Sequence, residues 1–184
     1  MKKSLVVLFV FFGASASAQE VPDLFRDVAD YASVPQVLLY AVATHESGRT
    51  VGNVRSPHPW TLNIQGRGYY YKTRKEQFDA LMKNLPNTSR IDVSYMQINW
   101  RWYHEKLIDP WIATDPGFNL KTGAQILSEH HRYLKDWKAA TAQYHTTIPD
   151  VGRKYAERVW LELQGICERP KLDGVEIAEC LELL

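Results

Sequence analysis

A glutamate stands on a helix face that otherwise points into the core. Leu38, Val42 and Glu46 are spaced four residues apart, so they share one face of a helix expected over residues 35–47. Burial and the negative end of the helix dipole both disfavour a carboxylate, which raises the pKa of Glu46 toward the range of a general acid. The structural alternative is a glutamate at a helix end that simply reaches water, and this helix taken alone favours that alternative.

The histidines do not form a metal motif. His45 precedes Glu46, but the helical zinc protease motif needs a second histidine four residues after the first, and position 49 is Arg49. His130 and His131 are adjacent on an expected helix, so they point to different sides. We therefore predict neither a metal site nor a cofactor.

Three further clusters could converge on Glu46. Residues 94–99 (SYMQIN) are expected to be non-helical, and they mix amide side chains with a methionine, which suits hydrogen bonds and apolar contact to a sugar. Residues 119–123 (NLKTG) open a later helix, and residues 142–145 (AQYH) close another. Taken singly, each cluster is more often structural, with Met96 and Leu120 in the core, Asn119 at a helix start and Tyr144 as a packed aromatic.

The elements that must position these clusters follow from the spacing of apolar residues. Helices are expected over residues 22–32, 35–47, 73–85, 100–107, 118–134, 137–145 and 151–166. Residues 60–71 indicate a small hairpin or glycine-bent flap, and residues 90–99 an extended or irregular segment. The predicted fold is mainly α, of the α+β class, with a compact helical domain and a small β-hairpin.

Composition and charge exclude several classes of protein. The 184 residues are 45% hydrophobic and 23% charged, which predicts one globular domain with a core. The chain carries 22 basic and 21 acidic side chains, and removal of residues 1–18 leaves 20 and 21, a net charge of −1. No global basic field is therefore available to hold nucleic acid or an anionic membrane.

The N-terminus has the three-part layout of a cleaved secretory signal. Met-Lys-Lys is followed by an apolar run over residues 5–12 and then by Ala16-Ser17-Ala18. We expect cleavage after Ala18 and a soluble mature protein in the periplasm, because no later window approaches the roughly 20 apolar residues of a membrane span. The expected organisation is a signal peptide over residues 1–18, a domain over 19–166 and a C-terminal tail over 167–184.

The tail holds both cysteines of the chain, Cys167 and Cys180. An oxidising compartment favours a disulfide between them across a short loop. Two unpaired thiols are the alternative, and zinc is disfavoured because the tail offers no histidine as a further ligand.

Taken in order, the clusters resemble the soluble lytic transglycosylases. The pattern of that family is a helix ending in Glu-Ser-Gly, a Gly-Leu-Met-Gln-Ile-Asn segment, Asn-Leu with a glycine, Ala-Tyr-Asn, and a tyrosine with a hydrophobic residue four positions on. This chain has ESG at 46–48, SYMQIN at 94–99, NLKTG at 119–123, QYH at 143–145, and Tyr155 with Val159. The resemblance covers about residues 30–165. Residues 66–70 (GRGYY) followed by a helix also resemble the subgroup found with conjugative transfer and pilus systems.

The resemblance implies a lysozyme-like fold and a peptidoglycan lyase. It implies that Glu46 first protonates the oxygen of the β-1,4 bond between N-acetylmuramic acid and N-acetylglucosamine. Glu46 then takes the proton of the 6-hydroxyl of N-acetylmuramic acid as that hydroxyl attacks C1, which gives a 1,6-anhydro product. The implied partners are peptidoglycan glycan strands and, through the subgroup, a conjugation, secretion or pilus machine, with the enzyme a monomer. The residues carried over as substrate contacts are Ser47, Met96, Gln97, Asn99, Asn119, Tyr144, His145 and Tyr155.

This chain departs from the pattern at three main positions. Ser94 and Tyr95 replace the glycine and leucine, and His145 replaces the asparagine, changes that bear on substrate affinity more than on the chemistry. Two other functions stay open, namely a lysozyme that uses water as the acceptor and a catalytically weak wall-binding assembly protein. Asp92 is the best candidate for a second carboxylate, although we expect a structural role for it.

Residues 60–71 are expected to form a mobile flap or wall that contacts the glycan. Three successive tyrosines, Tyr69 to Tyr71, cannot all face inward on a strand, so at least one should be exposed. Exposed aromatic rings stack on sugars, and Arg67 could meet a carboxylate of the substrate. The alternative is a hairpin that packs Trp60 and two tyrosines over the helix ending at Glu46.

Overall fold

The computed structural model describes residues 22–168 and 177–184, so the expected signal peptide lies outside the described residues. Within these ranges the fold is mainly α with small antiparallel strands, which confirms the predicted class. The helices are α1 (Asp23–Ala32), α2 (Gln36–Ser47), α3 (Arg74–Asn84), α4 (Trp100–Leu107), α5 (Pro110–Ala113), α6 (Pro116–Leu134), α7 (Trp137–His145), α8 (Pro149–Cys167) and α9 (Ile177–Leu183). The strands are β1 (Arg49–Val51), β2 (Val54–Ser56), β3 (Thr61–Ile64), β4 (Arg67–Tyr70), β5 (Ile91–Val93) and β6 (Ile98–Asn99).

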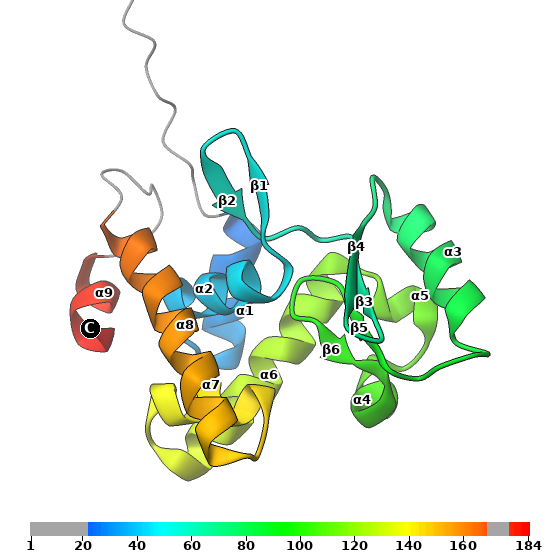
Figure 1. The fold of residues 1–184 in the computed structure, drawn as a ribbon. Coiled ribbons are helices and arrows are strands. Elements are labelled where there is room, and N and C mark those ends of the chain that lie inside the picture. Colours follow the sequence, from blue (N-terminus) through cyan, green and yellow to red (C-terminus); the bar gives the residue numbers. More distant parts are fainter. Residues whose placement is uncertain (1–21, 169–176) are drawn as a thin grey trace, which may run out of the picture.

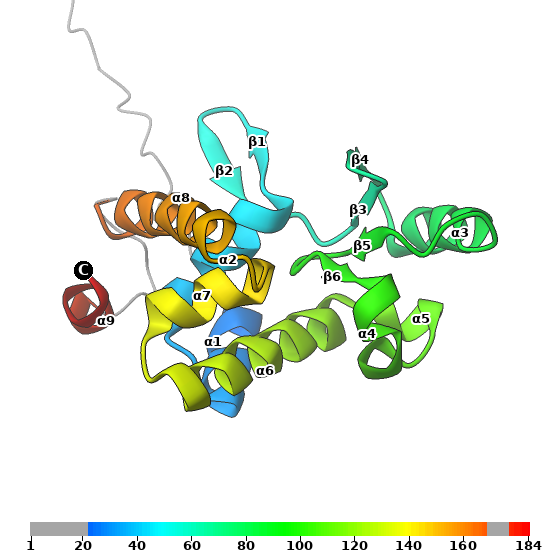
Figure 2. The same cartoon turned by 60° about the horizontal axis from the view of Figure 1, so that its bottom comes forward.

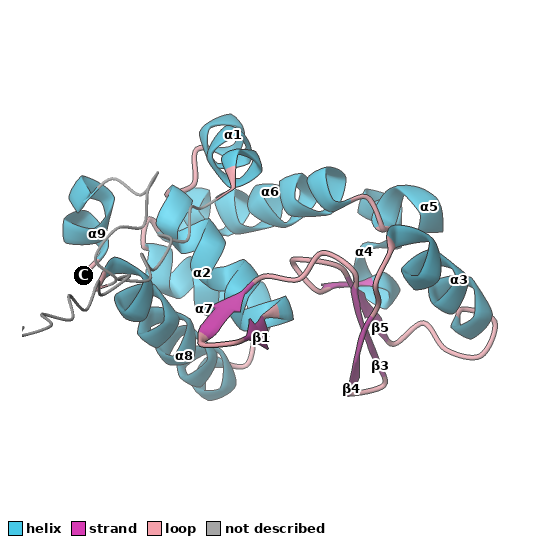
Figure 3. Ribbon diagram, turned by 90° about the horizontal axis from the view of Figure 1, so that it is seen from above, coloured by secondary structure: helices cyan, strands magenta, loops and turns pink. Residues whose placement is uncertain are grey.

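The elements form two groups at opposite ends of the molecule (Figure 1). Helices α1, α2, α7 and α8 pack together at one end, and strands β3 to β6 lie with α3, α4 and α5 at the other (Figure 3). The long helix α6 contacts α1 and α7 as well as α4 and α5, so it joins the two groups (Figure 2). Among the described residues, none of the helices is long and apolar enough to cross a membrane.

Helix α2 is the central helix of the core. Residues 36–44 are all buried, and the helix packs against α1, α8, α9 and β2. This stretch (QVLLYAVAT) contains no charged side chain, which suits a helix that is covered on every side. Glu46 follows in the last turn, where α2 leaves the core.

The expected hairpin at residues 60–71 is the β3–β4 pair, in which Leu62 lies opposite Tyr69. The antiparallel sheet has the order β4-β3-β5-β6, so β3 also pairs with β5. Leu62 and Val93 face each other across that pair, and both are fully buried. The expectation of a flap outside the core is therefore wrong for β3, although Tyr69 and Tyr70 of β4 are exposed as predicted.

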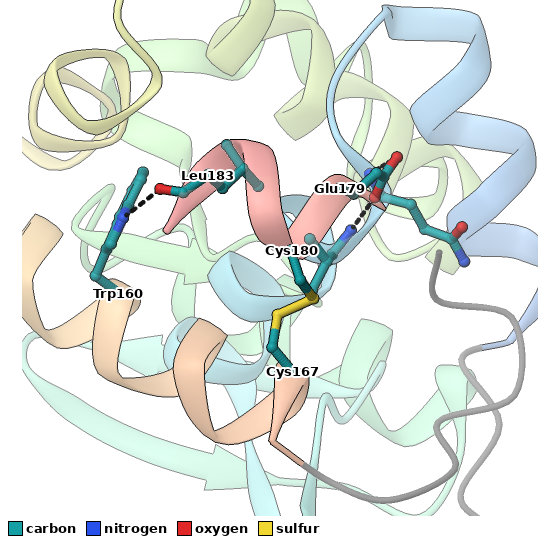
Figure 4. The surroundings of a disulfide bond; sticks show 7 residues. Trp160, Cys167, Glu179, Cys180 and Leu183 are labelled. Carbon is teal, nitrogen blue, oxygen red and sulfur yellow. Dashed lines mark hydrogen bonds between the residues drawn. A yellow bond between two sulfur atoms is a disulfide. The ribbon is translucent and has the colours of Figure 1, made fainter. Parts of the chain in front are cut away.

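The last helix is fastened to both α8 and α2 (Figure 4). A disulfide joins Cys167, at the end of α8, to Cys180 of α9, the pairing that the sequence favoured. Glu179 of α9 accepts hydrogen bonds from the backbone N–H groups of the first two residues of α2, at 3.3 and 3.1 Å. Pro35 precedes α2 and has no side chain that could cap it, so Glu179 caps the helix from the far end of the chain.

Candidate active site

Glu46 lies in the last turn of α2 with part of its side chain exposed. Burial raises the pKa of its carboxyl group from 4.5 to about 7; a hydrogen bond from Tyr155 opposes this rise, and the charge of Asp92 adds to it. The Tyr155 O–H donates to Glu46 Oε1 at 2.5 Å. Near pH 7 the carboxyl group is therefore about half protonated, so it can both give and take a proton.

An arginine from the following hairpin closes the C-terminal end of α2. Arg55 on β2 donates from Nη1 to the Gly48 carbonyl at 3.0 Å and from Nη2 to the Thr44 carbonyl at 3.1 Å, and its Nε meets Glu162 of α8 at 3.1 Å. A Cβ atom at Gly48 would lie 2.1 Å from the Thr44 oxygen and 2.8 Å from the guanidinium carbon. The glycine that follows Glu46 and Ser47 is therefore required for space, since its φ of −59° is open to any residue.

Two histidines flank the ring of Tyr155 on α8. The His145 ring, at the end of α7, lies parallel to the Tyr155 ring with the centroids 4.4 Å apart and an interplanar angle of 2°. His45 of α2 meets the same ring edge-on at 5.1 Å. Burial raises the pKa of Tyr155 well above its ordinary value and the Glu46 charge adds to this, so the hydroxyl remains a donor at neutral pH. Helices α2, α7 and α8 thus each supply a side chain to one cluster.

The segment at residues 94–99 makes a tight turn that explains one departure from the family pattern. Ser94 and Gln97 have positive φ values of 61° and 42°, and Gln97 Nε2 donates to the Ser94 carbonyl at 2.8 Å. A glycine would adopt the conformation of Ser94 at little cost. The serine instead gains a buried hydrogen bond from Gln77 Nε2 to its Oγ, at 2.7 Å. The Tyr144 hydroxyl donates to the Met96 carbonyl at 2.7 Å and ties the turn to α7.

Asn119 and Gly123 hold the same turn from one face of α6. Asn119 Oδ1 accepts the Met96 N–H at 3.0 Å, and its Nδ2 donates to the Val93 carbonyl at 2.9 Å. A Cβ atom at Gly123 would lie 2.5 Å from Met96 Cγ. The asparagine and glycine four residues apart therefore act together to seat the buried Met96.

Asp92 is a second carboxylate within electrostatic range of Glu46. It lies on β5 and accepts a hydrogen bond from Asn99 Nδ2 at 2.5 Å. Burial raises the pKa of Asp92, while the bond from Asn99 and the charge of Arg90 oppose that rise. The bond across the β5–β6 pair gives Asp92 the structural role expected for it and also presents its charge to Glu46.

The predicted contact residues differ in how far they can be reached. Ser47, Met96 and Asn119 are each 0% exposed, and the Ser47 hydroxyl donates to the Ala43 carbonyl at 2.9 Å. Their side chains are packed within the fold, and direct contact of these three residues with a substrate stays a prediction. Tyr155 is also buried, at 2% exposure, but its hydroxyl reaches Glu46. The predicted residues that keep accessible side-chain surface are Gln97, Asn99, Tyr144 and His145.

Strand β4 connects the sheet to the end of α2. The Tyr70 hydroxyl donates to the Gly48 carbonyl at 3.1 Å, while the Tyr70 side chain remains 48% exposed and Tyr69 37% exposed. Arg67 on the same strand is exposed. The hairpin therefore contacts the end of the helix that carries Glu46 and still presents two aromatic rings to solvent.

Two residues of the site region, Arg55 and Gln77, are absent from the sequence prediction. Arg55 lies on a three-residue strand, which is too short to show a pattern. Gln77 precedes Leu81 by four residues, so a polar residue on the apolar face of α3 was a signal for a buried amide.

Among residues 22–168 and 177–184, no group of three or more His, Cys, Asp or Glu side chains is placed to hold a metal ion. No protein-family model, curated protein or solved structure matches this chain. The functional assignment therefore depends on the residues and their geometry.

Proposed function

We propose that the protein is a peptidoglycan lytic transglycosylase in which Glu46 is the single catalytic acid and base. The observation that carries this proposal is a partly exposed carboxyl group at the end of a buried helix, with a pKa of about 7 and a hydrogen bond from Tyr155. The resemblance of the ordered motifs to soluble lytic transglycosylases supports the substrate class. Export to the periplasm, action as a monomer on glycan strands, and service to a conjugation, secretion or pilus machine belong to the same proposal.

Tyr155 determines which oxygen of Glu46 carries the proton. Because the phenolic O–H donates to Oε1, the carboxylic proton belongs on Oε2. From Oε2 it passes to the oxygen that leaves C1 of N-acetylmuramic acid, and the glycosidic C1–O bond breaks. The 6-hydroxyl of the same sugar then forms a bond to C1, and its proton returns to the Glu46 carboxylate. The products are a 1,6-anhydro sugar and a free 4-hydroxyl, and no water is consumed.

The exposed side chains of β4, the strand whose Tyr70 hydroxyl reaches the end of α2, suit a glycan with carboxylate groups. Tyr69 and Tyr70 offer aromatic faces for stacking on sugar rings, and Arg67 offers a cation for the lactyl or peptide carboxylate. The partly accessible amides of Gln97 and Asn99 add polar groups from the turn at residues 94–99. These contacts are part of the proposed binding mode.

A lysozyme-type hydrolase is the second candidate, and the position of Asp92 favours it. Its charge acts on Glu46, and a second carboxylate is what most glycosidases use as a base or nucleophile. The hydrogen bond from Asn99 already occupies Asp92, which supports the transglycosylase instead. The two reactions differ in product mass, because hydrolysis adds one water and transglycosylation adds none.

The test is digestion of purified sacculi by the mature protein, with mass spectrometry of the released muropeptides. We expect 1,6-anhydro products, and we expect Glu46→Gln to lower the rate by about 100-fold to 10,000-fold, the usual cost of losing a general acid. Glu105→Gln on the exposed surface of α4 is the matched control and should keep full activity. Hydrated products would establish the hydrolase. Sacculi that bind the protein but release nothing would identify a wall-binding protein, and a folded, active Glu46→Gln variant would overturn the assignment of Glu46.

A further inference from the structure

His145 occupies a place that the proposed reaction does not use. It is the last residue of α7, and its imidazole stacks face to face on the Tyr155 ring at 4.4 Å. Tyr155 in turn donates to Glu46 Oε1 at 2.5 Å. A ring on α7 is therefore coupled to the carboxyl group on α2 through one phenol on α8.

The stack covers the Tyr155 side of the Tyr155–Glu46 pair. The His145 side chain is exposed, whereas the Tyr155 beneath it is only 2% exposed. Removal of the imidazole would therefore uncover one face of the Tyr155 ring. Burial is the largest cause of the raised pKa of Glu46, so additional water on the Tyr155 side would lower that pKa.

We propose that His145 is a positioning residue: its stacked imidazole holds the Tyr155 phenol against Glu46 and keeps water from the Tyr155 side of the pair. This inference rests on the proposed role of Glu46 as the acid. It differs from a sugar contact, because the imidazole acts through Tyr155 and its effect exists without substrate. The asparagine that the resembled family carries at this position has no ring to stack.

The charges around the cluster are compatible with a neutral imidazole. Burial lowers the pKa of His145, and the Arg158 cation on α8 lowers it further, so the ring is uncharged at pH 7. The pKa of the neighbouring His45 is also lowered, chiefly by burial and then by Arg158, with smaller contributions from Arg55 and His145. The charge of Glu162 acts in the opposite direction and raises it.

Asp92 on β5 and Tyr155 are the groups that act on Glu46 from the elements packed around it. Tyr144, next to His145 on α7, is neutral because burial and the Glu46 charge raise its pKa. An uncharged stack covers the site without placing a cation there, and a cation would stabilise the carboxylate at the expense of the acid.

The test compares His145→Ala and His145→Asn with His145→Phe, which keeps a flat ring. The Glu46 pKa is read from the pH titration of its side-chain carboxyl carbon by NMR, with Glu46→Gln used to assign the signal. We expect Ala and Asn to lower this pKa by about one unit, because burial is the largest cause acting on it and outweighs the opposite effect of a loosened Tyr155 hydrogen bond. We expect Phe to leave it near 7, the value in the parent.

Turnover of sacculi is the second readout. A pKa lowered from 7 to about 6 reduces the protonated fraction at pH 7 from about half to about a tenth. His145→Ala should therefore lose about fivefold in kcat/KM at pH 7, with the alkaline limb of the kcat/KM profile displaced by the same one unit. His145→Phe should restore both, which the loss of a hydrogen bond from the imidazole to a sugar would not explain.

The outcomes separate this proposal from the proposed function. The NMR titration needs no substrate, so it decides the role of His145 even if sacculi are not cleaved. An unchanged Glu46 pKa in folded His145→Ala would overturn the positioning role. A raised KM in both Ala and Phe variants with an unchanged pKa would assign His145 to sugar binding instead. If circular dichroism shows that His145→Ala is unfolded, the comparison of the Glu46 pKa in His145→Asn and His145→Phe decides the question.

Discussion

Replacement of Glu46 by glutamine should stabilise the folded protein at high pH. The pKa of Glu46 is about 7 in the folded protein against an ordinary 4.5, so the folded state binds the proton more tightly than the unfolded chain. Ionisation of Glu46 therefore favours unfolding. The cost is absent below pH 4.5, grows as the pH rises toward 7, and is complete above 7. Glutamine has nearly the same shape and no charge, and its amide oxygen still accepts the Tyr155 O–H, so the substitution removes only the ionisation cost.

The size of the effect follows from the difference between the two pKa values. One pKa unit corresponds to about 1.4 kcal/mol, so the rise from 4.5 to about 7 is worth about 3 kcal/mol at most, because part of the side chain reaches solvent. Urea unfolding of the parent and of Glu46→Gln at pH 4.5 and pH 8.5 measures it. At each pH the free energy of unfolding of the parent is subtracted from that of the variant. This difference should be larger at pH 8.5 than at pH 4.5, by up to about 3 kcal/mol.

Glu105→Gln supplies the control for the general effect of removing one acid. Glu105 is exposed on α4, so its substitution should leave the difference between the two pH values within about 0.5 kcal/mol of the parent. A stability difference between the parent and Glu46→Gln that does not change with pH would refute the claim that burial raises the Glu46 pKa. The acid role at neutral pH would then lose its physical basis.

Two further predictions concern the elements around the site. Gly48→Ala should lower the free energy of unfolding by about 1–3 kcal/mol, because its Cβ would lie 2.1 Å from the Thr44 oxygen. Gly165→Ala is the control: its Cβ would meet nothing within 4 Å in α8, so it should be neutral or stabilising by up to about 1 kcal/mol. Equal effects of the two substitutions in urea unfolding would contradict the steric role of Gly48. Reduction of the Cys167–Cys180 bond, 13 residues apart, should cost about 3 kcal/mol, measured as the loss of unfolding free energy with and without reductant, and an unchanged value would show that the bridge does not hold α9.

The sequence predicted those parts of the fold that depend on local pattern. The apolar spacing around Leu38 and Val42 predicted α2 to within one residue at its start, and its end at Ser47 followed from Gly48. The succession of three tyrosines after a glycine turn predicted a hairpin with an exposed ring. These features are local, because periodicity and turn residues act over a few positions.

The missed elements depend on contacts between distant parts of the chain. Strands β1 and β2 have three residues each and become informative only when Arg55 reaches the carbonyls at the end of α2. Helix α9 is short, and its main role is visible only when Glu179 meets the N–H groups at the start of α2. An isolated helix of this length is unstable in water, so its formation depends on packing that local sequence does not encode.

Burial is the largest cause of the raised pKa of Glu46. The sequence placed the carboxyl group at the negative end of α2, but Arg55 donates to two carbonyls there and offsets that end of the dipole. The charge of Asp92 adds to the effect of burial, and the hydrogen bond from the Tyr155 hydroxyl opposes it. Burial in turn depends on nine consecutive uncharged residues that keep α2 inside the core until its last turn. The helix brings the carboxyl group to the border of the core, where it meets both water and the Tyr155 phenol, and this position is what suits Glu46 to the proposed role of general acid.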